Sequence, residues 1–111
     1  MITRTAIFEG RVKNGCEERF FSEIKARLAP LWRQFPHATN IRLLRIMSSD
    51  ADAQPVAMIQ QIDYPSIAAL EEAIGSPIRT EARAITMELM EMFEGRFYHL
   101  LSEGNVAEDG A

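Results

Sequence analysis

The sequence predicts an α+β fold in which a four-stranded antiparallel sheet carries its helices on one face. Three observations support this prediction: apolar runs of strand length, apolar stripes at helical spacing, and glycine or proline residues at the boundaries between them. The resulting order is strand, helix, strand, strand, helix pair, strand. This order is the split β-α-β arrangement of ferredoxin-like folds.

The first strand is expected over residues 3–13, where side chains alternate between an apolar and an amphipathic face. Asn14 and Gly15 end it, and a helix follows. The apolar stripe of that helix consists of Phe20, Ile24, Leu28, Leu31 and Phe35. Pro30 lies within the stripe and cannot donate a backbone hydrogen bond, which predicts a kink near residues 27–29.

Two central strands are expected at residues 40–48 and 55–63, because both segments are rich in Ile, Leu, Val and Met. The polar residues 49–53 between them are typical of a hairpin connection, so the two strands are expected to pair antiparallel. Both faces of both strands are largely apolar. Each face of the sheet therefore needs a cover.

The helix pair is marked by its boundary residues. Residues 64–66 open the first helix, and Gly75 is interpreted as the left-handed residue that commonly ends one. Ser76 is then expected to cap the second helix, with Pro77 at the first helical position, where a missing N–H costs nothing.

The second helix of the pair is expected to run to Phe93, and Gly95 to release the chain into a last strand at residues 96–101. We therefore expect one domain over residues 1–103 and a flexible C-terminal tail at residues 104–111. A chain of 111 residues is long enough to bury roughly two-thirds of the surface that its unfolded form exposes.

Composition excludes several classes of function. The net charge of −4, with acidic and basic residues interspersed, gives no basic stripe for a phosphate backbone, so no nucleic-acid partner is expected. No apolar run approaches the roughly 20 residues that cross a bilayer, and the polar start lacks a signal peptide's apolar segment, so we expect a cytoplasmic protein without a membrane partner. The single cysteine and two histidines fit neither a disulfide nor a structural zinc site, and no cofactor is expected.

The sheet face opposite the helices is expected to be apolar, through Ile7, Leu44, Ile46 and Ile59 or their strand neighbours. A monomer rarely exposes so large an apolar patch. A two-fold homodimer is the economical cover, because one patch then serves both subunits.

The layout, together with residues 64–70, 75–79 and 93–99, resembles the dimeric α+β barrel superfamily, especially its EthD-like and antibiotic-biosynthesis-monooxygenase-like members. The resemblance implies that two sheets close into a barrel and that a pocket lies between the sheet and the helices of each subunit. Members include cofactor-free oxygenases, dehydratases, isomerases, haem-degrading enzymes and proteins of unknown activity, so the fold leaves the function open.

His99 is the candidate catalytic residue. It lies in the predicted last strand on the same face as Phe97 and Leu101, and an imidazole with an ordinary pKa near 6.5 suits proton transfer. There it could abstract a proton from a bound phenol or ketone. The alternative is a histidine that is hydrogen-bonded in the core or at the dimer interface.

Candidate substrate-binding residues come from the end of the first helix. Trp32 could stack on a flat ligand at a pocket mouth that also includes His37, and Arg33 could hold an acid. Packing at the rim explains the same residues without a ligand.

Three further candidates lie in or beside strands. Gln60 and its neighbour Gln61 point to opposite faces, so one of them should be inward and could orient a carbonyl. Tyr64 and Tyr98 could donate phenolic hydrogen bonds, although packing alone explains Tyr64 at a helix entry.

Two hypotheses result. The first is a cofactor-independent enzyme, monooxygenase-, isomerase- or dehydratase-like, that acts on a small hydrophobic or aromatic compound with His99 as general base. The second is a non-catalytic dimeric protein that binds a small molecule or serves an interaction role. Whether the chain is an enzyme stays open at this point.

Overall fold

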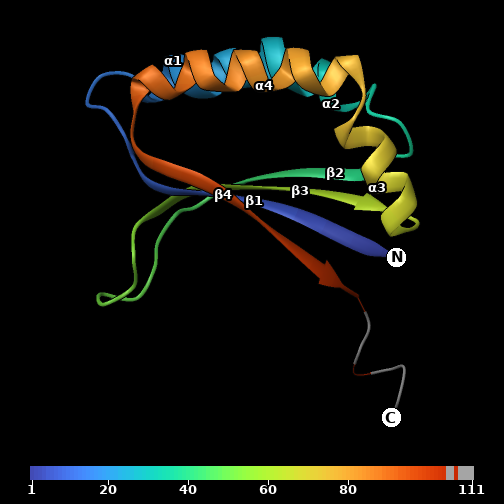
Figure 1. The fold of residues 1–111 in the computed structure, drawn as a ribbon. Coiled ribbons are helices and arrows are strands. Elements are labelled where there is room, and N and C mark those ends of the chain that lie inside the picture. The colour runs from blue at the N-terminus through green and yellow to red at the C-terminus, as the bar shows by residue number, and fades with distance from the viewer. Residues whose placement is uncertain (105–106, 108–111) are drawn as a thin grey trace.

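The computed structural model describes residues 1–104 and 107 and confirms the predicted α+β class (Figure 1). The strands are β1 (Ile2–Val12), β2 (Thr39–Arg45), β3 (Val56–Tyr64) and β4 (Phe93–Glu103). The helical elements are α1 (Glu17–Glu23), η1 (Ile24–Leu28), α2 (Ala29–Trp32), α3 (Ile67–Ile74), α4 (Pro77–Leu89) and η2 (Met90–Met92). Most of the predicted tail at 104–111 lies outside the described residues.

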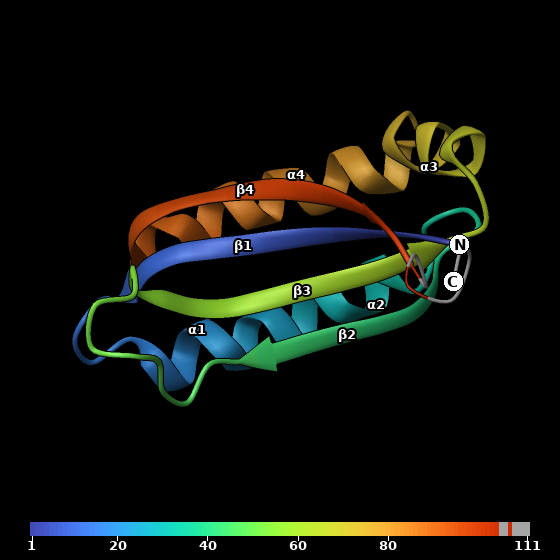
Figure 2. The ribbon, with the colours of Figure 1, turned by 90° about the horizontal axis from the view of Figure 1, so that it is seen from below.

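The strands form one antiparallel sheet in the order β2-β3-β1-β4. α1, α2 and α4 cover one face of this sheet, and α3 lies at its end (Figure 1). Figure 2 views the opposite face, which none of the helices in the described part of the chain covers. The predicted ferredoxin-like arrangement with helices on one face is therefore confirmed.

The core lies between the sheet and the helices. Alternate residues of a strand point to one face, and those that meet the helices are the buried ones, such as Phe8 in β1 and Met58 in β3. Phe20, Ile24 and Leu28 pack against them from the first helical segment. The burial of each of these side chains contributes roughly 1.5–3 kcal/mol before conformational entropy is counted.

Pro30 distorts the first helical segment, as the sequence indicates, and the form of the distortion is a π-turn at η1. The N–H of Ala29 donates to the carbonyl of Ile24, five residues earlier. The wider turn accommodates the missing Pro30 N–H and shifts the following residues around the helix axis. The predicted stripe is therefore wrong at its end: Trp32, at 6% exposure, is the buried residue, and Leu31 is only partly buried.

The boundaries of the helix pair follow the predicted caps. The Ser66 hydroxyl accepts a hydrogen bond from the Ala69 N–H at 3.1 Å, and the buried Ser76 hydroxyl accepts one from the Arg79 N–H at 3.4 Å. The prediction for Gly75 was wrong, because its φ of −81° is right-handed. Ser76 thus fixes the start of α4.

The last strand begins earlier than predicted. α4 ends at Leu89, η2 makes one tight turn, and β4 starts at Phe93, so Gly95 lies inside the strand and does not end a helix. Gly95 pairs with Gly10 of β1, and both have positive φ, 146° and 131°. A Cβ on either residue would collide with a carbonyl of the opposite strand. The two glycines therefore permit a close approach of the strands that no other residue allows.

The uncovered sheet face is apolar at its centre, as predicted. Ile59 of β3 lies opposite Ile7 of β1 and Leu44 of β2. Leu44 and Leu100 are 44% and 52% exposed in the single chain. Within the described part of the chain, no helix is long and apolar enough to cross a membrane.

Candidate functional site

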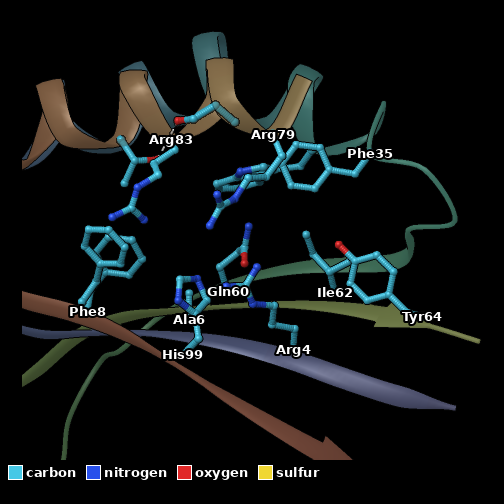
Figure 3. A pocket seen from close by; sticks show the side chains of 14 residues that line it. Arg4, Ala6, Phe8, Phe35, Gln60, Ile62, Tyr64, Arg79, Arg83 and His99 are labelled. Atoms are coloured by element: carbon cyan, nitrogen blue, oxygen red, sulfur yellow. Dashed lines mark hydrogen bonds between the residues drawn. The ribbon is translucent and has the colours of Figure 1, made fainter. Parts of the chain in front are cut away.

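A cavity of about 70 Å³ lies between the sheet and the helices (Figure 3). From the sheet it is lined by Arg4, Ala6 and Phe8 of β1, Gln60, Ile62 and Tyr64 of β3, and Phe97 and His99 of β4. From above it is lined by Trp32, Phe35, Arg79, Ala82, Arg83 and Thr86.

Strand register creates the floor of the cavity. Ala6 of the central strand β1 pairs with Gln60 on one side and with His99 on the other. All three point toward the helices, and the alanine methyl is the smallest side chain that could lie between the other two. The space above Ala6 is therefore part of the cavity.

A second, open groove of about 490 Å³ adjoins the cavity at the edge formed by β4 and α4. Arg83, Phe97 and His99 line both spaces, so the cavity opens toward this edge. The groove adds Met87 and Met90 from the helical side, and Gly95 and Arg96 from β4. A ligand can therefore extend from the cavity into the groove.

Three arginines converge on the cavity. Arg79 and Arg83, one helical turn apart, reach down from α4, and Arg4 rises from β1 (Figure 3). The ion pairs found among residues 1–104 involve other cations. Burial, followed by the charge of Arg79, lowers the pKa of Arg4 below its usual value. The described part of this cavity thus holds positive charge without a compensating acid.

His99 lies among these charges. Its ring meets the Phe97 ring edge-to-face with centroids 5.9 Å apart, and the residue is exposed at the β4 edge in the single chain. Desolvation, followed by the charges of Arg4, Arg79 and Arg83, lowers the pKa of His99 to about 4. The imidazole is therefore neutral at pH 7 and able to accept a proton.

Two neutral hydrogen-bonding groups complete the site. Tyr64 is 2% exposed, and burial raises the pKa of its phenol, so it remains a donor at neutral pH. Its hydroxyl points toward the cavity, as does the buried Gln60 amide (Figure 3). The other glutamine, Gln61, is on the opposite face, where it accepts from Arg42 at 3.0 Å.

The structure brings together four of the residues that the sequence suggested: Trp32, Gln60, Tyr64 and His99 all line the cavity. It does not bring in the other three. Arg33 is exposed beyond α2, and the exposed His37 lies 2.7 Å from Glu72 of α3. Tyr98 points to the uncovered sheet face, where the Arg96 guanidinium lies 5.0 Å from its ring, because adjacent residues of a strand alternate.

The predicted site residues did not include the three cavity arginines, Arg4, Arg79 and Arg83. Arg4 continues the even-numbered series of Ala6 and Phe8, so its strand face was readable from the sequence. Arg79 and Arg83 share a face of α4, but single arginines on an amphipathic helix usually face water. Among the described residues, no group of three metal-binding side chains comes together.

Comparison with known proteins identifies the fold. No protein-family model and no curated protein matches the chain. An EthD family protein from Bacillus halodurans aligns over 93% of this chain and 97% of its own, with a TM-score of 0.70 and 18% identity. A mutant of SnoaB, a cofactor-independent oxygenase from Streptomyces nogalater, aligns over 94% and 92%, with a TM-score of 0.66 and 18% identity.

A dimeric ferredoxin-like protein of unknown function from Jannaschia sp. CCS1 aligns over 92% of this chain and 97% of its own, with a TM-score of 0.66 and 17% identity. These similarities confirm the expected fold, that of EthD-like and monooxygenase-like proteins. At such identities the fold alone is shared, and function has to be argued from the site.

Proposed function

We propose that this chain, which has the fold of the dimeric α+β barrel superfamily, is a cofactor-independent enzyme acting on a small hydrophobic or aromatic compound. The observation that carries the proposal is a neutral histidine, His99, facing a cavity lined by three arginines. A base beside fixed positive charge suits reactions in which removal of a proton leaves an anion.

The proposed first step is abstraction of a proton from a phenol or from a carbon next to a carbonyl. The O–H or C–H bond breaks, an N–H bond forms on His99, and the electron pair remains on the substrate as a phenolate or enolate. The positive charge that the cavity arginines place around His99 stabilises this oxyanion, and Tyr64 or Gln60 donates a hydrogen bond to a substrate carbonyl. Monooxygenase-, isomerase- and dehydratase-like chemistry can all begin with this step.

The test follows that step and does not require the final product to be known. Small aryl ketones and 1,3-diketones are incubated with the protein in deuterated water, and exchange at the acidic carbon is followed by proton NMR. We expect exchange with at least one compound and a loss of about 100-fold or more in His99→Ala, since general base catalysis contributes 10²–10⁴-fold. Arg19→Gln, on the exposed side of α1, is the control. Full exchange in His99→Ala would remove His99 as the base.

A second candidate function is non-catalytic binding of a small molecule. The pKa of His99 is set by burial and by cations, with no hydrogen bond from a described residue, so no orienting partner of the usual catalytic kind is present in that part of the chain. This function is supported if compounds raise the melting temperature without any exchange or turnover.

We further propose that the uncovered sheet face joins two copies of the chain. Support comes from the apolar cluster of Ile7, Leu44 and Ile59 and from the dimeric ferredoxin-like protein with the same fold. Ile59→Lys places a charge at the centre of this face without touching the cavity. Sedimentation should then change from dimer to monomer, and a stable wild-type monomer at micromolar concentration would contradict the proposal.

A further inference from the structure

We propose that the cavity binds the carboxylate of an aromatic acid, with the carboxylate among Arg4, Arg79 and Arg83 and the ring in the groove at the β4–α4 edge. This assignment rests on the proposed function and deepens it, because it names the class of substrate for the same site. The charge of the cavity, the geometry of its donors and the shape of the two adjoining spaces support it.

The cavity concentrates positive charge. Three guanidinium groups around one small space repel one another, and a partly desolvated cation is costly unless it is paired. Arg4 carries this cost, since burial and Arg79 both lower its pKa. None of the acids that pair within residues 1–104 reaches these three arginines. A bound anion would supply the missing partner.

The guanidinium donors approach the cavity from two directions. Arg79 and Arg83 descend from one helix face, and Arg4 approaches from the sheet, so the anion is met from two sides (Figure 3). Arg83 is held over the Phe97 ring, with its guanidinium carbon 5.9 Å from the ring centroid. Guanidinium groups bind planar carboxylates through paired, charge-assisted hydrogen bonds.

The cavity and the adjoining groove differ in size and in lining. The partly open cavity of about 70 Å³ is well below the roughly 300–1,000 Å³ of an ordinary ligand site, so a whole aromatic acid does not fit inside it. The adjoining groove of about 490 Å³ has the apolar side chains of Met87, Met90 and Phe97 on its walls. A charged end inside and a flat apolar end outside match the two spaces.

Anion binding also changes the proposed base. In the free protein, desolvation and then the charges of Arg4, Arg79 and Arg83 disfavour protonation of His99 and lower its pKa. A carboxylate that neutralises part of this charge raises the pKa of His99 back toward its usual range and makes it a stronger base. A bound acid would therefore make His99 a better proton acceptor than it is in the free protein.

The test is calorimetric titration of the full chain at pH 7 with benzoate, benzamide and phenyl phosphate. We expect benzoate to bind at least tenfold more tightly than the neutral benzamide, and each of Arg79→Gln and Arg83→Gln to weaken benzoate on the order of tenfold. Arg19→Gln, which removes one positive charge from the outer face of α1, should leave the affinity unchanged. Because the two variants relieve repulsion, their melting temperatures should not fall below that of the wild type.

Three outcomes would overturn the assignment: equal affinity for benzamide and benzoate, benzoate affinity that is unchanged in both arginine variants, or phenyl phosphate bound more than tenfold tighter than benzoate. These results are independent of catalysis. If benzoate binds through the arginines but no ketone exchanges deuterium, with 4-acetylbenzoate, which carries both a carboxylate and a ketone, among those tested, the proposed enzyme is refuted and the acid-binding site stands.

Discussion

Ala6 of β1 lies directly opposite His99 of β4, and both side chains line the same cavity. The histidine is accessible from that cavity because its partner across the strands is only a methyl group. The size of residue 6 therefore controls whether a ligand can reach the imidazole.

Ala6→Leu should fill the cavity floor. We expect benzoate binding to weaken by at least tenfold, and the free energy of unfolding to fall by about 1–3 kcal/mol because the added carbons crowd a packed region. Calorimetry and urea unfolding measure the two effects. Ala68→Leu makes the same change on the exposed side of α3, away from the cavity lining, and is the control for benzoate affinity. Wild-type affinity in Ala6→Leu would place the ligand elsewhere.

The pKa of His99 depends on the burial and the charges of the cavity, so measuring it tests both. The charged and titratable groups that face it are Arg4, Tyr64, Arg79 and Arg83 around the cavity, whereas the Arg96 guanidinium lies over Tyr98 on the other sheet face. An NMR titration should give a pKa of about 4 in the wild type. We expect the value to rise toward 6.5 in Arg79→Gln/Arg83→Gln, because the double variant removes two nearby cations. A wild-type value near 6.5 would contradict the geometry described for this residue.

The same shift makes stability depend on pH. Because the folded-state pKa of about 4 lies below the ordinary value near 6.5, the unfolded chain binds the His99 proton first. Stability from this group is complete above pH 6.5 and is lost as the pH falls toward 4. We therefore expect His99→Gln to lose less stability than the wild type between pH 6.5 and 4.5, measured by urea unfolding.

Asp63 also makes stability depend on pH, but at more acidic pH than His99. Its hydrogen bonds from Thr3, Asn40 and Arg42 outweigh burial and keep the pKa of this carboxyl below 3.8. Its contribution is therefore lost only at more acidic pH, outside the window of His99. If the stability of His99→Gln and of the wild type changed identically from pH 6.5 to 4.5, the lowered pKa of His99 in the folded protein would be refuted.

Gly95 should be intolerant of any side chain. Gly95→Ala combines an unfavourable positive φ with a collision against the carbonyl of Glu9, and we expect a loss of about 1–3 kcal/mol or more. Gly15→Ala is the matched control, since Gly15 also has a positive φ, 82°, but has open space around it. Equal losses in the two variants would show that the close approach of β1 and β4 is not important for stability.

The sequence predicted elements whose cause is local. Ser76 and Pro77 predict a helix start because a cap and a fixed φ act within one turn. The structure has this cap in place. Gly95 was misread because the same residue type that ends a helix also permits two strands to approach, and only the pairing with Gly10 distinguishes them.

The site was predicted in part for the same reason. His99 and Gln60 followed from strand alternation, but their position beside Ala6 depends on strand register. The burial of Trp32 depends on a π-turn that the Pro30 signal does not specify. The convergence of Arg79 with Arg4 depends on how α4 lies over the sheet, which is a tertiary property.

The most direct test of the central claim is a crystal structure of the protein soaked with benzoate. We expect the carboxylate within about 3 Å of the Arg79 and Arg83 guanidinium groups, as in charge-assisted hydrogen bonds, and the ring between Met87, Met90 and Phe97 with His99 beside it. Benzoate bound only on the uncovered sheet face, or an empty cavity at a concentration that saturates calorimetric binding, would contradict the site described between the sheet and α4.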